Sequence, residues 1–497
     1  MAPFNPELFL SMLALIAAVI VVSALLSGMI EKSGFPQVAV FLGLGALIGP
    51  AGLNLLDADL HSPILRVVAT LSLVLVLFTD AVSINLKEVR QHRLLSALVL
   101  GPGTLFSALL IAGLSWWWLG LNPALAAILG AALASTDPVL LRGLLRRREV
   151  AAGVRQVLRL EGGLNDAVLL PIVLVGMTIL GQGRALTGKE WAQLGLNILI
   201  LSPAAGAVVG LAAVGMLELV RRRIGVRRDY ESIYSLGVAF AAFAAAESVH
   251  GSGFLAAFAA GLVISAVDVE LCDCFLEYGE TTAEMALMFT FVLFGTSLIW
   301  TGLGIAGVGT LFFAAAVFGA RLLAFIPALL PARLSWKHRW LIAWFGPRGL
   351  SSLLLVLLPV FAGLPGSERL LTICCLVVLC SVVLHGLSPM VLIRSEPDSA
   401  DVRESAPPFP ILDAPHPAPA SGPIVLDDPD YISIEEIQRL QQQRSVPVVI
   451  VDSRSERTYE ESTEAIPGAI RLHPDRAVQE AEQHKIAKGN VLAVLCA

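Results

Sequence analysis

Apolar runs separated by short polar connections fill the chain up to about Ile393. Each run has roughly twenty residues, which is the length of a helix that crosses ~30 Å of hydrocarbon. The pattern predicts an all-α polytopic membrane protein with about 13 transmembrane helices. The predicted spans are 8–30, 36–56, 63–84, 94–119, 123–145, 156–182, 190–220, 231–250, 253–267, 284–302, 304–330, 340–361 and 368–393.

The composition supports a membrane protein. Of the 497 residues, 56% are hydrophobic and only 15% are charged, whereas about a quarter of the residues of a soluble protein are charged. The first run, 8–30, is longer than the core of a signal peptide and lacks a basic leader, so we interpret it as a span. The net charge of −6 gives no indication of nucleic-acid binding.

The polar connections alternate in positive charge, which predicts an orientation. One set is rich in arginine and lysine, and the other holds little beyond Arg184, Lys189 and Arg369. The positive-inside rule therefore places the N-terminus outside and the C-terminus in the cytoplasm, in a multi-pass protein of the plasma (inner) membrane. The basic set comprises Lys87, Arg90, Arg93, Arg142, Arg146, Arg147, Arg148, Arg155, Arg221, Arg222, Arg223, Arg227, Arg228, Arg333, Lys337 and Arg339.

Charged and amide side chains lie inside three of these spans. At 1.5 Å per residue, Asp166 lies roughly 15 Å from the cytoplasmic surface, and Asp137 and Arg348 lie roughly 12 Å from it. Glu161 and Asn165 belong to the same span as Asp166. An intramembrane charge costs ~2.5–3.5 kcal/mol on insertion scales, so charges at one depth on three spans predict a functional site near the midplane.

Prolines predict that two of these spans are interrupted helices. The aspartate of "TDP" (136–138) precedes a proline and is pushed out of the helical region. The motif "GPRG" (346–349) places a proline next to a flexible glycine. Freed carbonyls and helix ends at such breaks can ligand a cation or hold a charge. These are the fifth and the twelfth predicted spans, seven positions apart. That offset fits a six-helix unit that is repeated with inverted topology after one linker helix.

Two interpretations of the buried polar residues differ in how much they explain. A structural ion pair accounts for Glu161 and Arg348 alone. An ion site also accounts for Asp137, Asn165 and Asp166, whose oxygens suit an alkali cation, and no Cys or His joins the cluster as in a transition-metal site. Interfacial or packing roles are favoured for Asp80, Glu247, His250 and His385.

Three motifs resemble those of the cation:proton antiporter-1 family, the bacterial sodium/proton exchangers and their animal relatives. They are "ASTDPV" (134–139), "EGGLND" (161–166) and "GPRG" (346–349), in the family's order and on its spans five, six and twelve. The resemblance covers about residues 8–393. It implies a homodimer in which each chain has a scaffold half and a mobile core half, and it implies no cofactor.

The resemblance also implies roles for individual residues. Asp166 would bind the cation or the proton, with Asp137 and the backbone near Thr136 beside it. Asn165 would occupy the place of a second aspartate found in electrogenic relatives, and it would pair with Glu161.

The resemblance also implies that Glu161 pairs with Arg348.

The sequence departs from the family pattern at two positions. Gly162 stands where the family often has a serine whose hydroxyl helps to ligand the ion, so this ligand is missing or supplied by water. Thr79 stands at the common acidic position of span three, with Asp80 beside it. Both departures bear on ion selectivity.

Carboxylate chemistry gives the expected transport reaction. A single site that holds either a proton or a hard monovalent cation forces exchange if the empty, charged site cannot cross. Because Asn165 is neutral, one carboxylate trades one cation for one proton, which predicts electroneutral exchange of Na⁺, or of K⁺ or Li⁺, for H⁺. Interrupted helices and a single site favour this mechanism over a channel.

The C-terminal part has a different composition. Residues 394–429 are rich in Pro, Asp, Ser and Ala and are interpreted as a linker. In residues 430–497 the pattern predicts a helix at "ISIEEIQRLQQQ" and then three short strands. The segments "VDSRSERTYEES" and "IPGAIRLH" resemble rhodanese-like domains, so a partial α/β domain is expected here.

Cys496 directly follows the last predicted strand, where rhodanese-like domains carry the cysteine that takes up a persulfide. The sequence ends one residue later, so we expect at most part of such a domain and no catalysis from it, and a small core residue is an equal interpretation of Cys496. The alternative function is a membrane-anchored sulfurtransferase or sulfur sensor. An anchor needs no buried charges, so the midplane cluster favours transport.

Overall fold

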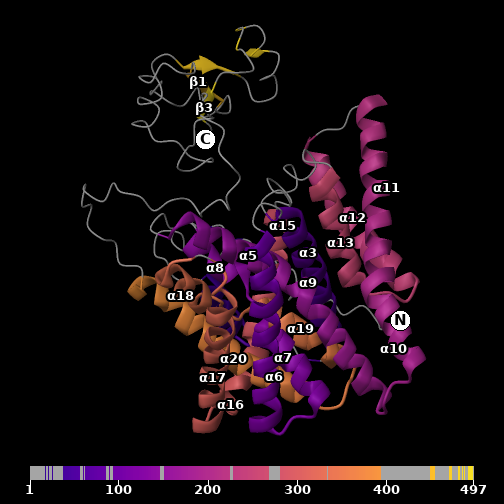
Figure 1. The fold of residues 1–497 in the computed structure, drawn as a ribbon, viewed down its shortest axis with the longest axis vertical. Coiled ribbons are helices and arrows are strands. Elements are labelled where there is room, and N and C mark those ends of the chain that lie inside the picture. Colours follow the sequence, from indigo (N-terminus) through magenta and orange to yellow (C-terminus); the bar gives the residue numbers. More distant parts are fainter. Residues whose placement is uncertain are drawn as a thin grey trace. The chain divides into compact units, whose positions relative to one another are not determined.

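A computed structural model gives the fold, in which the chain divides into two compact units, Met1–Ile411 and Leu412–Ala497 (Figure 1). The described residues are 37–392 apart from 56–59, 61, 85–88, 90–92, 146–149, 224–227, 268–279 and 333, together with 17, 21, 25 and short stretches of 448–495. Most of the predicted span 8–30, the linker 394–429 and Cys496 lie outside them.

The first unit is helical, and helices occupy every predicted span from the second onward. They are α2 (Gln37–Ile48), α3 (Pro63–Ser83), α5 (Arg93–Leu98), a π-helical segment (Val99–Gly103), α6 (Thr104–Leu119), α7 (Pro123–Ala134), α8 (Pro138–Leu145), α9 (Ala152–Gln182), α10 (Gly188–Leu196), a second π-helical segment (Asn197–Leu201), α11 (Ser202–Arg223), α12 (Arg228–Ser248), α13 (Gly253–Val267), α15 (Glu280–Thr296), a 3₁₀ turn (Leu298–Trp300), α16 (Thr301–Gly304), α17 (Val308–Ala328), α18 (Trp336–Trp344), α19 (Leu350–Phe361) and α20 (Ser367–Leu392).

The helix in the second predicted span is shorter than expected. The prediction of 36–56 was wrong at its end, because the helix stops at Ile48. Pro50 disfavours a helical backbone at the residue before it, and Asn54 has a left-handed φ of 52°. Among the described helices, seven are long and apolar enough to cross a membrane, and a bent pair within 285–304 makes eight, so the total of 13 stays a prediction.

The helices pack mainly within two groups. One group contains α2, α3, α11, α12, α13 and α15, and the other contains α5 to α9 and α16 to α20. Figure 1 shows α6 and α7 next to each other in the second group, where they pack closely. The groups meet chiefly where α3 contacts α9 and α19. We call the first group the scaffold group and the second the core group; the expectation that they correspond to a scaffold half and a mobile core half stays a prediction.

The outer surface of both groups is apolar. Leu109 on α6, Val208 on α11 and Leu323 on α17 are 65%, 65% and 71% exposed. A large exposed apolar surface marks contact with another apolar phase, and a bilayer provides it around helices of this length.

Glycines allow several of these helices to approach closely. A Cβ added at Gly206 of α11 would overlap the backbone of Ala256 on α13, and one added at Gly261 of α13 would overlap the backbone of Phe78 on α3. Small residues at such contacts are typical of membrane helices, which associate through close packing because lipid gives them no hydrophobic driving force.

The strands of the second unit form one parallel sheet. β1 (Val448–Asp452) lies between β2 (Ile470–Arg471) and β3 (Val491–Leu495). Both pairings are parallel, as in an α/β fold. The three predicted strands are therefore confirmed, whereas the helix predicted before them lies outside the described residues. The likeness to rhodanese-like domains stays a prediction.

We expect Gly206→Val to lower the thermal stability of the protein in detergent, because the new side chain pushes α11 away from α13. Gly215→Val is the matched control, since Gly215 lies on the same helix and has no atom within 4 Å of an added Cβ. The measurement is the midpoint of thermal unfolding. Equal midpoints for the two variants would contradict the close packing at Gly206.

Candidate functional site

Two interrupted helices meet inside the first unit. α7 ends at Ala134 and α8 begins at Pro138, and α18 ends at Trp344 and α19 begins at Leu350. The backbone N–H of Asp137 in the first break donates to the carbonyl of Pro347 in the second at 2.9 Å. The prediction of two discontinuous helices is confirmed, and their breaks are in direct contact.

Arg348 lies at the C-terminal end of α7. Its Nη1 donates to the carbonyls of Ala134 at 3.1 Å and Ser135 at 3.2 Å, and to Thr136 Oγ1 at 3.3 Å. The C-terminus of a helix carries partial negative charge and unpaired carbonyls. The guanidinium, which is fully buried, therefore satisfies carbonyls that the break sets free.

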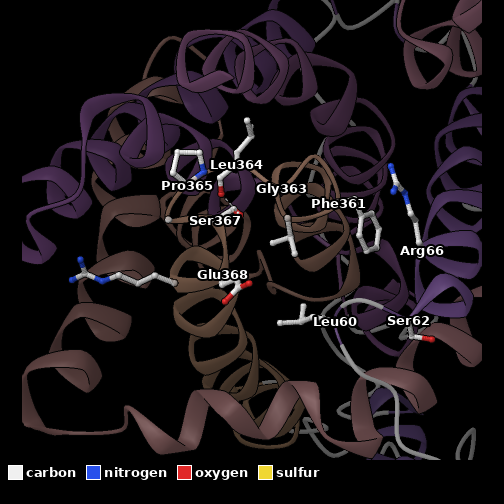
Figure 2. Close-up of a pocket in the computed structure, with 12 residues that line it drawn as sticks. Leu60, Ser62, Arg66, Phe361, Gly363, Leu364, Pro365, Ser367 and Glu368 are labelled. Atoms are coloured by element: carbon white, nitrogen blue, oxygen red, sulfur yellow. Dashed lines mark hydrogen bonds between the residues drawn. The ribbon is translucent and has the colours of Figure 1, made fainter. Parts of the chain in front are cut away.

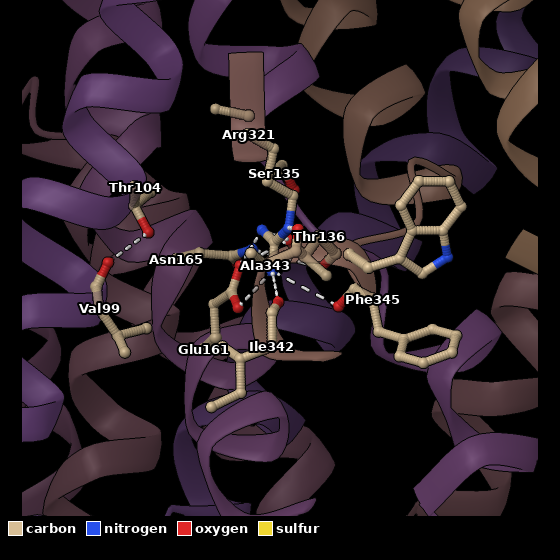
Figure 3. Close-up of polar contacts among 12 residues, drawn as sticks. Val99, Thr104, Ser135, Thr136, Glu161, Asn165, Arg321, Ile342, Ala343 and Phe345 are labelled. Carbon is tan, nitrogen blue, oxygen red and sulfur yellow. Dashed lines mark hydrogen bonds and ion pairs between the residues drawn. The ribbon is translucent and has the colours of Figure 1, made fainter. Parts of the chain in front are cut away.

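Arg321, in the middle of α17, does the same at the C-terminal end of α18 (Figure 3). Its Nε donates to the carbonyl of Ala343 at 3.0 Å, and its Nη2 donates to that of Ile342 at 3.0 Å. Sequence reasoning missed this residue. The signal that could have found it is a single arginine inside the apolar run predicted at 304–330.

Asp137 serves the opposite helix ends. Its Oδ1 accepts from the N–H of Val139 at 2.9 Å, and its Oδ2 accepts from the N–H of Leu350 at 2.6 Å. One carboxylate thus caps the N-termini of α8 and α19, where partial positive charge stabilises an anion. Asp137 was predicted to lie beside the cation. In the structure both of its carboxylate oxygens accept hydrogen bonds from helix N-termini, and its role beside a cation stays a prediction.

The two glycines of "GPRG" make room for these charges. A Cβ at Gly346 would overlap the guanidinium of Arg321, and a Cβ at Gly349 would overlap the carboxylate of Asp137. The motif therefore needs glycine because charged side chains from α17 and from the first break fill the space beside its backbone.

Glu161 pairs with Arg321, so the predicted ion pair with Arg348 was wrong. Arg321 donates to Glu161 Oε1 at 2.5 Å and to Oε2 at 2.8 Å. Thr136 Oγ1 also donates to Oε1 at 2.9 Å. Among the described residues no ion pair joins Glu161 to Arg348. The reason is geometric, because the fork of Arg321 takes both carboxylate oxygens and Arg348 is held at the end of α7.

The predicted pairing of Asn165 with Glu161 was also wrong. Asn165 Nδ2 donates to the carbonyl of Thr136 at 3.3 Å. The amide therefore satisfies another carbonyl of the first break, since the oxygens of Glu161 are already occupied.

Asp166 is buried at the crossing, with one oxygen bound and one open. The hydroxyl of Ser135 donates to its Oδ1 at 2.5 Å, and the Ser351 side chain is close enough to interact. Asp166 Oδ2 and Asn165 Oδ1 are buried and accept no hydrogen bond from the described residues. Unsatisfied buried oxygens are costly, so this pair favours a proton or a cation as its ligand.

A small cavity lies beside these residues, between α3, α8, α15 and α19. Its volume is about 30 Å³, and its polar lining consists of Thr79, Asp80, Asp137 and Ser351. This is the space of about one water molecule. Asp80, in the last turn of α3, therefore lies beside Asp137 at the crossing. The interfacial or packing role favoured for it stays a prediction.

His385 on α20 joins both sides of the second break. Its Nε2 lies 3.2 Å from the carbonyl of Trp344, and its Nδ1 lies 3.1 Å from Ser381 Oγ. The N–H of Arg348 donates to the same hydroxyl at 2.6 Å. The ring also contacts Phe318 and Trp344. The interfacial or packing role favoured for His385 stays a prediction.

A larger cavity, of about 620 Å³, lies at the far ends of α3, α19 and α20 (Figure 2). Arg66 lines it, and its guanidinium lies 5.8 Å from the centre of the Phe361 ring. Arg66 precedes Asp80 on α3 by roughly 20 Å at 1.5 Å per residue. The larger cavity is therefore separate from the crossing and contains none of the predicted site residues.

Comparisons of the sequence with known proteins agree on one family. The family described as sodium/hydrogen exchanger, transmembrane, matches residues 17–393. The chain is 26% identical over 370 residues to the K(+)/H(+) antiporter NhaP of Alkalimonas amylolytica, covering 72% of this chain and 62% of that protein. It is 26% identical over 369 residues to the Na(+)/H(+) antiporter NhaP of Pseudomonas aeruginosa, covering 69% and 85%.

The fold is similar to that of a solved antiporter. The sodium proton antiporter MjNhaP1 from Methanocaldococcus jannaschii, at pH 8, aligns with a TM-score of 0.64 at 21% identity, covering 76% of this chain and 99% of that one. The chain spans 62% of the NhaP of A. amylolytica and 64% of the NhaP2 of Shewanella sp. (strain MR-4).

We expect Glu161→Gln and Arg321→Gln each to lower stability in detergent, because removing one partner of a buried ion pair costs ~3–5 kcal/mol. The double variant loses both charges and should recover part of the loss. The measurement is thermal unfolding of the four proteins in one detergent. The control cycle uses Glu161→Gln with Arg348→Gln and should be closer to additive. Stronger coupling in the control cycle would contradict the pairing seen here.

Proposed function

Because the chain belongs to the sodium/hydrogen exchanger family, we propose that it exchanges a monovalent alkali cation for protons across the membrane. The observation that carries the proposal is Asp166, a buried carboxylate at the crossing of two interrupted helices. Its Oδ1 accepts from the Ser135 hydroxyl, and its Oδ2, like the amide oxygen of the next residue along the helix, Asn165, is buried with no hydrogen-bond partner among the described residues.

Three charges of the motifs have partners that hold them in place. Glu161 is paired with Arg321, Asp137 accepts from two helix N-termini, and Arg348 donates at the end of α7. Asp166 is bound through a neutral serine hydroxyl instead. Among Asp137, Glu161 and Asp166, it is therefore the carboxylate whose charge a proton or a cation neutralises most easily.

Neutralisation of Asp166 supplies the coupling. While the Asp166 carboxylate is ionised and has no ligand, movement of the core group past the scaffold group would carry a bare charge through the membrane, which is unfavourable. With H⁺ or a cation bound, the site is neutral and the movement becomes possible. In this proposal the two groups move past each other where α3 contacts α9 and α19. One carboxylate and a neutral Asn165 give one cation for one proton.

Relatives with this fold are named for potassium and for sodium exchange. We propose Na⁺ as the cation, with K⁺ and Li⁺ as alternatives, because the ligand atoms are all hard oxygens. The protein works as a homodimer in the plasma membrane, with its N-terminus outside and its C-terminus in the cytoplasm.

We expect Asp166→Asn to abolish exchange and to leave a folded protein, because the amide cannot alternate between a proton and a cation. The measurement is cation-driven proton movement in proteoliposomes, read by an internal pH dye with Na⁺, K⁺ and Li⁺ in turn. Glu190→Gln, at an exposed ion pair with Arg184, is the control and should keep wild-type rates. Wild-type rates in the Asp166→Asn variant would remove this residue from the mechanism.

We expect the exchange to be electroneutral, because a single carboxylate binds one cation on the way in one direction and one proton on the way back. The membrane potential is clamped with potassium and valinomycin at several values, with sodium as the substrate. The initial rate should not change with the imposed voltage. A clear change of the exchange rate with voltage would show that net charge crosses the membrane in each cycle, and would contradict one-for-one exchange at a single carboxylate.

A further inference from the structure

We propose that Ser135 supplies a hydroxyl ligand to the cation that binds at Asp166, and that it does so in place of a side chain at Gly162. This inference rests on the proposed exchange function and names the third oxygen of its site. The sequence motifs give no special role to Ser135, and its contact with Asp166 is seen only in the fold.

The backbone of Ser135 is fixed independently of its side chain. Ser135 lies in the break between α7 and α8 and is fully buried. Its N–H donates to the carbonyl of Ala131 at 3.3 Å, and its own carbonyl accepts from Arg348 at 3.2 Å. The break therefore fixes the Ser135 backbone, and the hydrogen bond to Asp166 Oδ1 shows where its Oγ atom points.

The hydroxyl has one hydrogen and two lone pairs. The hydrogen is used by Asp166 Oδ1 at 2.5 Å. No donor to Ser135 Oγ occurs among the described residues, so its lone pairs are open for a cation. The Ser135 hydroxyl can therefore donate its hydrogen to Asp166 and bind a cation through an oxygen lone pair at the same time.

Two further oxygens belong to neighbouring residues of α9. Asp166 Oδ2 and Asn165 Oδ1 are buried and have no hydrogen-bond partner within the described part of the chain. Together with Ser135 Oγ, they are the carboxylate, amide and hydroxyl oxygens that we propose for the cation. These are hard ligands, which suit an alkali cation and bind soft metals poorly.

The position one helical turn before Asp166 on α9, Gly162, has no side chain that could supply a hydroxyl. Gly162 precedes Asp166 by four residues on α9, so the two positions share one face of the helix. A Cβ at Gly162 would have Pro138 Cβ as its nearest neighbour, at 3.4 Å. A serine would therefore fit there, but the sequence has none, and the hydroxyl comes from Ser135 on the facing element.

A purely structural role makes a different prediction. The Ser135 hydroxyl donates to a side chain and not to a helix carbonyl, so alanine keeps both backbone bonds of the break. A structural serine would change stability when removed, with no selective effect on the cation. A ligand changes the apparent affinity for the cation.

The test measures initial exchange rates in proteoliposomes at one pH over a range of Na⁺ concentrations. We expect Ser135→Ala to raise the KM for Na⁺ about tenfold, the scale expected for loss of one charge-assisted interaction, with a smaller change in kcat. Ser135→Thr keeps the hydroxyl and should stay close to wild type. Ser135→Ala combined with Gly162→Ser should recover part of the affinity, because the hydroxyl returns from α9.

The control is Ser115→Ala, which removes a buried hydroxyl that donates to Ile111 within α6. It should leave KM unchanged. If Ser135→Ala does not fold, Ser135→Cys keeps the shape of serine and replaces the oxygen by a soft sulfur, and it should raise KM in the same way.

Two outcomes would overturn the inference. One is a wild-type KM in Ser135→Ala or, where that variant does not fold, in Ser135→Cys. The other is a loss of kcat at unchanged KM. Failure of the proposed function is a separate result, seen as an absence of exchange in the wild type or as full exchange in Asp166→Asn. An active wild type, an inactive Asp166→Asn and an unchanged Ser135→Ala would reject the Ser135 ligand alone.

Discussion

Where a helix breaks inside a membrane, its freed N–H and C=O groups must be satisfied by other parts of the protein, because hydrocarbon offers no partners. Here two breaks lie against each other, and charged side chains of the matching sign fill both. Arg348 and Arg321 meet the negative ends of α7 and α18, and Asp137 meets the positive starts of α8 and α19. The positions of the other site residues follow from this arrangement.

The same constraint separates fixed charges from the exchangeable one. A charge held by a helix end or by a bidentate partner is expensive to remove, as Glu161 with Arg321 illustrates. Asp166 is held by the neutral hydroxyl of Ser135, so its charge can be neutralised and restored without loss of a buried ion pair. The proposed exchange uses both kinds of carboxylate, since the fixed ones would keep the crossing intact while Asp166 would bind the proton or the cation.

Small residues give this arrangement its compactness. Gly346 and Gly349 leave the space that Arg321 and Asp137 occupy. Close helix contacts such as that at Gly206 build the scaffold group with little polar chemistry. Arg321, Arg348, Asp137 and Glu161 all lie in the core group, and the scaffold group contacts it mainly through α3, which brings Asp80 to the edge of the crossing. Such a division suits relative movement, because the ion pair and the helix-end contacts of the crossing remain within one group.

The sequence by itself determined the apolar helices and the two breaks, because both depend on local properties: run length and proline sterics. It could not assign partners. The sequence suggested Arg348 as the partner of Glu161, yet the guanidinium of Arg321 binds this carboxylate, because α17 packs beside α18. Only the tertiary structure decides which of two arginines meets a carboxylate, since that depends on how helices far apart in the chain are oriented and packed.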